Sequence, residues 1–72
     1  MKTRITFYKR TWCKIRYWQS LNDISDETLA RYLGMSVRSL KNYDKDAQCV
    51  TMGSIDNFLY ATNLDFEELL KM

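Results

Sequence analysis

The residue types that most often carry out catalysis or bind metal ions are scarce in this 72-residue chain. Histidine, the commonest general acid and base, is absent. Cys13 and Cys49 stand alone, whereas structural zinc sites need several thiolate or imidazole ligands, usually in closely spaced pairs. A nucleophilic cysteine would also need a neighbouring base. We therefore expect two reduced thiols, no metal or other cofactor, no small-molecule substrate and no enzymatic activity.

The charged residues are distributed unevenly along the chain. Residues 1–17 contain six Lys and Arg residues and no acid, whereas residues 46–72 contain five acids and one lysine. A basic segment of this kind favours a phosphate group or an acidic protein surface as its partner. A merely solvated helix face is the alternative, so the charge distribution alone leaves the partner open.

Length and composition indicate one small globular domain over residues 1–72. Hydrophobic residues make up 46% of the chain and aromatic residues 14%, which is typical of a folded domain rather than a disordered segment. No apolar stretch approaches the ~20 residues that cross a bilayer. The basic N-terminus lacks the continuous apolar region and small-residue cleavage site of a signal peptide. We therefore expect an intracellular protein without a membrane segment.

The basic N-terminal segment, residues 1–21, is expected to contain the first helix. Its apolar residues recur at roughly helical spacing from about residue 6 onwards. Ile5 and Phe7 would also suit a short strand, because both residue types favour extended backbone. The start of this element is therefore left open between a helix and a strand.

Suitable end signals frame a second helix over about residues 26–33. Ser25 is a good N-cap, and the carboxylates of Asp26 and Glu27 would interact favourably with the positive end of the helix dipole. Gly34 follows the last apolar residue and can adopt the left-handed conformation that commonly ends a helix. We therefore expect a short helix followed by a sharp turn.

The sequence pattern predicts three further helices. Ser36 can cap a helix over about residues 37–44, and Thr51 can cap the next one. Asp65 and Glu68 have the spacing of a capping box, which predicts a short final helix. The residues expected on the inner faces of the five helices, and hence in one core, are Ile15, Trp18, Leu29, Ala30, Leu33, Met35, Leu40, Ile55, Phe58, Leu59 and Leu69.

The segment from residue 24 to residue 70 resembles the lambda-repressor-like helix-turn-helix family. The resemblance is carried by ISDETLARYLGMSVRSLKNYD and its continuation TMGSIDNFLYATNLDFEELLK. The run LGMS, residues 33–36, matches the family's turn between its second and third helices, and Leu40 and Tyr43 fall where the third helix is anchored. The resemblance implies an all-α fold, a five-helix lambda-repressor-like domain.

In this family the third helix enters the major groove of DNA, with its first residues near the base edges. Arginine can pair with guanine and asparagine with adenine, so Arg38 and Asn42 have suitable chemistry. Val37 could contact only a thymine methyl group. Ordinary solvation of a helix face is the alternative for the basic residues. By resemblance, the candidate DNA-binding residues are Val37, Arg38, Lys41, Asn42 and Lys45.

The chain departs from the family at the start of the second helix. The family usually carries a Gln there that binds a DNA phosphate, whereas this chain has Asp26, with Asp23 and Glu27 beside it. Carboxylates repel phosphates, and phosphate contacts supply much of the affinity of such domains. Helix capping and the helix dipole alone would also explain Asp26 and Glu27. Residues 44–46 lack the family's glycine, and Val50 stands where proline is common.

Three functions are consistent with this pattern. In size and pattern the chain resembles the small modulators of repression of temperate lactococcal phages, which implies an antirepressor that binds a helix-turn-helix repressor and blocks or redirects its operator binding. Acidic residues would complement the repressor's basic DNA-reading surface. On this hypothesis the candidate partner-binding residues are Asp23, Asp26, Glu27, Arg38, Lys41 and Asn42.

The alternative is a Cro-type repressor that binds operator DNA directly through its third helix, and a toxin–antitoxin or other regulator with the same fold is a third hypothesis. Each of them implies a regulator in the cytoplasm of a bacterial host cell. A phage genetic switch is the implied setting for the first two.

Overall fold

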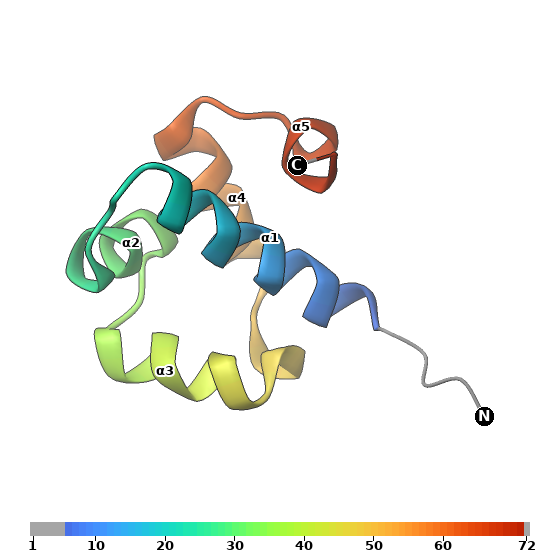
Figure 1. Cartoon of the computed structure of the whole chain (residues 1–72). Helices are drawn as coiled ribbons and strands as arrows, with labels where there is room; N and C mark the ends of the chain where they lie inside the picture. Colours follow the sequence, from blue (N-terminus) through green and yellow to red (C-terminus); the bar gives the residue numbers. More distant parts are fainter. Residues whose placement is uncertain (1–5, 72) are drawn as a thin grey trace.

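The structure is a computed structural model that describes residues 6–71 and is all-helical over that range (Figure 1). The five α-helices and one short 3₁₀ helix are α1 (Phe7–Leu21), α2 (Asp26–Leu33), α3 (Val37–Lys45), η1 (Ala47–Cys49), α4 (Met52–Thr62) and α5 (Phe66–Leu70). Over residues 6–71 the expected all-α class with five helices is confirmed. Phe7 begins α1, so the short-strand alternative is wrong at that residue, and Ile5 lies outside the described residues.

The helix ends follow local sequence signals. Each of the four longer α-helices begins after a Ser or Thr whose hydroxyl accepts a hydrogen bond from the backbone N–H three residues further on. At α5 the Glu68 carboxylate accepts a hydrogen bond from the backbone N–H of Asp65 at 3.1 Å, as in a capping box. Gly34 and Asn63 end α2 and α4 in the left-handed conformation, with φ of 73° and 58°.

The core is formed by one cluster of buried apolar side chains. Its members are Trp12, Ile15, Leu29, Ala30, Leu33, Leu40, Ala47, Phe58 and Leu69. The expected residues Trp18, Met35, Ile55 and Leu59 are only half-buried and pack against it. Trp18, for example, lies edge-on to Phe58, with ring centroids 5.1 Å apart. Trp12 and Ala47 are buried members that sequence spacing did not predict.

The arrangement of the helices explains how α3 is held. Helix α4 packs on α2, and α5 packs on α1, while η1 contacts both α1 and α3. Figure 1 shows α1 running across the molecule, with α2 near its C-terminal end and α3 along one side. Helix α3 therefore packs mainly on α2 and η1, and its contact with α1 involves the polar side chains described next.

Candidate functional site

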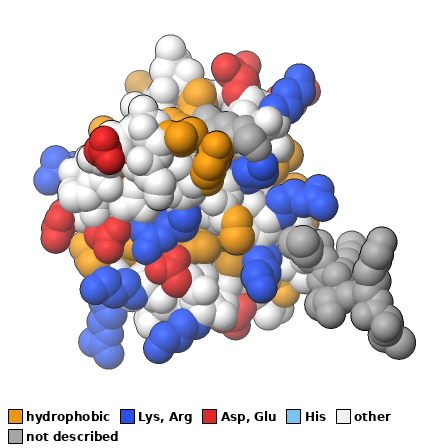
Figure 2. Space-filling model, viewed as in Figure 1, with side chains coloured by type: hydrophobic (Ala, Val, Ile, Leu, Met, Phe, Trp, Pro, Cys, Tyr) orange, Lys and Arg blue, Asp and Glu red, His pale blue; other side chains and the backbone are white. Residues whose placement is uncertain are grey.

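Helix α3 presents one polar and mainly basic face to solvent. Arg38, Lys41, Asn42 and Lys45 are all exposed, and their spacing of three, four and seven residues places them along a single helix face. Leu40 lies on the opposite side and is fully buried. Figure 2 shows Lys and Arg side chains in the region of α3, with acidic side chains between them. Four of the five candidate DNA-binding residues therefore share an accessible surface.

Val37, the fifth candidate, has a different environment. It is the first residue of α3, but its side chain is half-buried and packs against the core cluster. Its methyl groups therefore help to hold the start of α3 against the domain. They are less available to a binding partner than the side chains of the exposed face.

The three acidic candidates surround the start of α2. Asp23 is exposed in the turn between α1 and α2, with a φ of 52°, and Glu27 is exposed in the first turn of α2. The side chain of Asp26 is only 37% exposed. Asp23 and Asp26 also line an open hollow of about 620 Å³. The structure thus brings all three acids to one region but leaves only two of them largely exposed.

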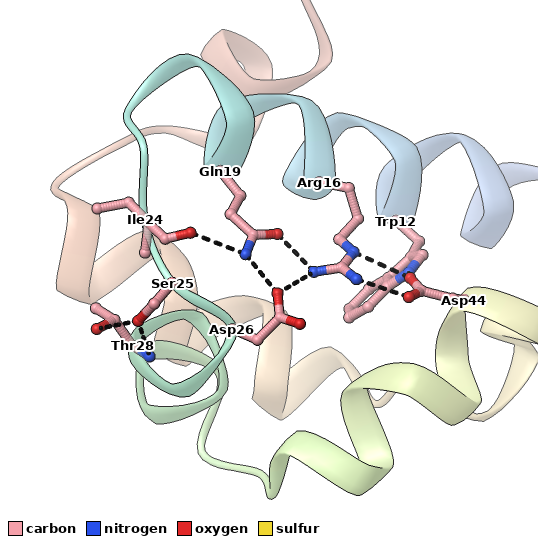
Figure 3. Close-up of polar contacts among 8 residues, drawn as sticks. All are labelled: Trp12, Arg16, Gln19, Ile24, Ser25, Asp26, Thr28 and Asp44. Carbon is pink, nitrogen blue, oxygen red and sulfur yellow. Dashed lines mark hydrogen bonds and ion pairs between the residues drawn. The ribbon is translucent and has the colours of Figure 1, made fainter.

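Asp26 is bound within the fold through a network centred on Arg16 of α1 (Figure 3). Nη1 of Arg16 lies 3.1 Å from Oδ1 of Asp26. The same guanidinium contacts Asp44 of α3 twice, through Nη2 to Oδ2 at 2.7 Å and through Nε to Oδ1 at 3.0 Å. One cation from α1 is therefore shared by carboxylates from α2 and α3.

Two further side chains complete this Arg16 network. Gln19, which is buried, accepts a hydrogen bond from Arg16 and donates to Asp26 at 2.8 Å and to the Ile24 carbonyl at 3.0 Å. Nε1 of Trp12 donates to Asp44 at 2.8 Å. Within residues 6–71, no buried side-chain nitrogen or oxygen lacks a hydrogen-bond partner. The network therefore joins three helices without an unsatisfied polar group.

The network favours the ionised forms of Arg16 and Asp26. Burial acts to lower the pKa of Arg16, but its hydrogen bonds to Asp44 and Asp26 outweigh this effect, and the pKa of Arg16 rises above its ordinary value. The hydrogen bond from Gln19, followed by that from Arg16, lowers the pKa of Asp26. The positive charge of Lys41 on α3 also lowers the pKa of Asp26. The basic face of α3 therefore interacts electrostatically with Asp26.

Four residues of the network were not predicted from the sequence, namely Trp12, Arg16, Gln19 and Asp44. One signal was present, because Gln19 follows the buried Ile15 by four residues and so lies on the inward face of α1. A buried glutamine needs polar partners. Their identity could not be read from the sequence, because Asp44 is 28 residues away from Arg16 along the chain.

The described part of the chain lacks two kinds of feature. It holds no group of three or more Cys, Asp or Glu residues able to bind a metal ion. None of its helices combines the length and apolar character needed to cross a bilayer. Cys13 and Cys49 are both free and exposed.

Comparison of the chain with protein-family models, with curated proteins and with solved structures gave no match.

Proposed function

We propose that this protein is a small antirepressor with a lambda-repressor-like helix-turn-helix fold, in which α2 and α3 form the helix-turn-helix. It binds the DNA-binding domain of a partner repressor and blocks or redirects that repressor's operator binding in a phage genetic switch. The sequence resemblance supports the fold. The charge at the start of α2 supports the choice of a protein partner.

The observation that carries the proposal is the arrangement of acidic side chains around Arg16. The guanidinium of Arg16 is bound to two carboxylates, Asp26 and Asp44, so the Arg16 network retains an excess of one negative charge. Asp23 and Glu27 lie beside it and are exposed. Arg16 is therefore already bound, and the exposed carboxylates of Asp23 and Glu27 leave the start of α2 anionic.

An anionic surface at this position disfavours DNA and favours a basic protein. In a helix-turn-helix domain the start of the second helix lies against the DNA backbone, where negative charge is repelled by phosphate. The surface with which a repressor reads DNA is rich in Lys and Arg, and opposite potentials speed association and select the partner. Occupation of that surface would exclude the operator directly.

Direct operator binding by a Cro-type repressor is the second candidate, and the exposed face of α3 favours it. Arg38 and Asn42 can form bidentate contacts with guanine and adenine, and Lys41 and Lys45 can contact phosphates. The two candidates differ in which charges matter. The acids of α2 are essential to the first and unfavourable to the second.

Charge reversal at Glu27 separates the two functions. Glu27 is exposed and takes no part in the Arg16 network, so Glu27→Lys should leave the fold intact. Glu67→Lys on α5 reverses another exposed acid in the first turn of a helix and serves as the matched control.

The partner is first recovered from the native host with the purified protein and identified by mass spectrometry. Its DNA-binding domain is then purified for titration.

We expect the recovered partner to be a helix-turn-helix repressor whose gel shift of its operator disappears when this protein is added. Glu27→Lys should weaken the complex about 3- to 30-fold and slow association most at low salt, because a charge at an interface acts on encounter. Glu67→Lys should bind as the wild type does. A specific operator shift by the purified protein alone, abolished by Arg38→Ala and strengthened by Glu27→Lys, would instead establish the Cro-type function.

A further inference from the structure

An apolar groove of about 450 Å³ runs between α1 and α4, beside η1 and α5. Phe7 and Tyr8 from the first turn of α1 and Met52 from the first turn of α4 lie along it. Phe7 is 56% exposed and Met52 84% exposed, although both are large apolar residues. Exposed apolar side chains gathered around one groove mark a surface that binds a partner. We name this feature the α1/α4 groove.

The groove is separate from the surface assigned to the repressor. No residue of α2 or α3 lines it. Figure 1 shows that the first turn of α1 lies at one edge of the molecule, whereas α2 lies near the other end of α1. An occupant of the groove would therefore leave Glu27 and Arg38 accessible. Lys45 at the end of α3, by contrast, shares a neighbouring hollow with Tyr8 and Lys9. The inference drawn from the groove does not depend on the proposed function.

We propose that the occupant is a second copy of this chain, docked through a two-fold axis that places the first turn of α1 of each copy in the groove of the other. Phe7 and Tyr8 both line the groove and are exposed, so the same residues can act as the inserted group and as part of the receiving wall. A surface that plays both roles is the requirement for a symmetric, isologous interface.

Charge complementarity supports the second copy over an unrelated partner. Lys9 and Arg10 follow Tyr8 in the first turn of α1 and are exposed. Asp56 is exposed and is the charged residue in the groove lining. When the first turn of α1 of one copy enters the groove of the other, Lys9 and Arg10 come close to Asp56 of that second copy. The two-fold axis produces the same pairing a second time.

The interface is small, and the dimer should accordingly be weak. A stable complex buries about 1,600 Å² in total, more than one groove and its rim provide in a domain of this size. We expect reversible dimerisation of the full chain at roughly ten to a few hundred micromolar, which corresponds to the weak end of protein association.

Sedimentation equilibrium and light scattering on the full chain across this concentration range test the proposal. Met52→Glu places a charge in the groove at the first position of α4, where a negative charge favours the helix. Tyr60→Glu is the matched control, because Tyr60 is 90% exposed on the same helix and lies outside the groove lining. Circular dichroism melts confirm that both variants are folded.

We expect Met52→Glu to raise the dimer dissociation constant about tenfold or more, as truncation of a central interface residue does, and Tyr60→Glu to leave it unchanged. Asp56→Arg and Arg10→Glu should each weaken the dimer, and the double variant should recover most of the loss. Three outcomes would overturn the proposal. The wild-type chain could stay monomeric over the whole concentration range, Met52→Glu and Tyr60→Glu could change the dissociation constant equally, or the double variant could fail to recover dimerisation. Loss of repressor binding, rather than of self-association, in Met52→Glu would overturn it as well.

Discussion

Arg16 and Asp44 lie 28 residues apart in sequence and meet through two hydrogen bonds, 2.7 Å from Nη2 to Oδ2 and 3.0 Å from Nε to Oδ1. This paired geometry is the strong form of an arginine–carboxylate contact. Asp44 lies in the last turn of α3, and Arg16 lies in the middle of α1. The contact therefore fixes the C-terminal end of α3 to α1. In this way it also orients the exposed polar face of α3.

Replacement of Arg16 should destabilise the fold and loosen α3. We expect Arg16→Ala to lower the free energy of unfolding by about 1–2 kcal/mol, because the ion pairs are partly solvent-screened but Asp26 and Asp44 lose a shared partner. Urea denaturation measures this change. Hydrogen exchange should show faster exchange in α3 than in α4, which contributes no side chain to the Arg16 network.

Lysine at the same position is the control for this variant. Lysine keeps the charge but cannot form the planar paired contact, so Arg16→Lys should recover only part of the lost stability. Wild-type stability in Arg16→Lys would show that charge alone, rather than the paired geometry, holds α3.

The pKa of Asp26 predicts a loss of stability in acid. The hydrogen bonds from Gln19 and Arg16 lower the pKa of Asp26 in the folded protein below its ordinary value of 3.8. Stability from this ionised carboxylate is therefore fully present above about pH 4 and is lost as the pH falls through the lowered pKa of the folded state. The difference in unfolding free energy between wild type and Asp26→Asn should be constant near neutral pH and should shrink below about pH 4.

Urea unfolding of both proteins between about pH 2 and 7 measures this difference. Gln19→Ala removes the donor with the largest effect on Asp26 and should move the acid transition toward higher pH. Parallel stability curves for wild type and Asp26→Asn down to the lowest pH would contradict the assignment.

Truncation of a buried core side chain should lower the free energy of unfolding strongly. Leu33 of α2 and Leu40 of α3 are fully buried, and replacement of either by alanine should cost roughly 2–5 kcal/mol from lost burial and the cavity left behind. That is a large part of the total stability of so small a domain. Leu21→Ala, at a position 59% exposed, is the control and should change stability little. A cooperative thermal melt unchanged by Leu33→Ala and Leu40→Ala would contradict the helix packing.

Gly34 should tolerate no side chain without cost. Its φ of 73° is unfavourable for other residues, and an added Cβ would lie 2.9 Å from Nδ2 of Asn57. We expect Gly34→Ala to destabilise the protein by about 1–2 kcal/mol. Combination with Asn57→Ala should relieve the steric contact but not the backbone strain, so chemical denaturation should show partial recovery. Full recovery would mean that the backbone conformation contributes nothing.

Local signals in the sequence determined the helices of this protein and where they begin and end. The N-cap hydroxyls act on backbone amides three residues away, and Gly34 and Asn63 supply left-handed ends, so both depend only on neighbouring residues. Apolar spacing also identified the buried side chains at the centre of each helix, such as Ile15 and Leu40, because one helix face must leave water.

Only the tertiary structure decided which distant residues meet. The sequence presents Arg16 as one more cation in a basic segment and Asp26 as a helix-start acid, whereas their pairing depends on how α1 lies against α2 and α3. The same packing half-buries Val37, buries Trp12 and leaves Phe7 and Met52 at an open groove. Hydrogen bonds and packing act over a few ångströms in space, so contacts between residues far apart in the chain arise only when the helices are assembled.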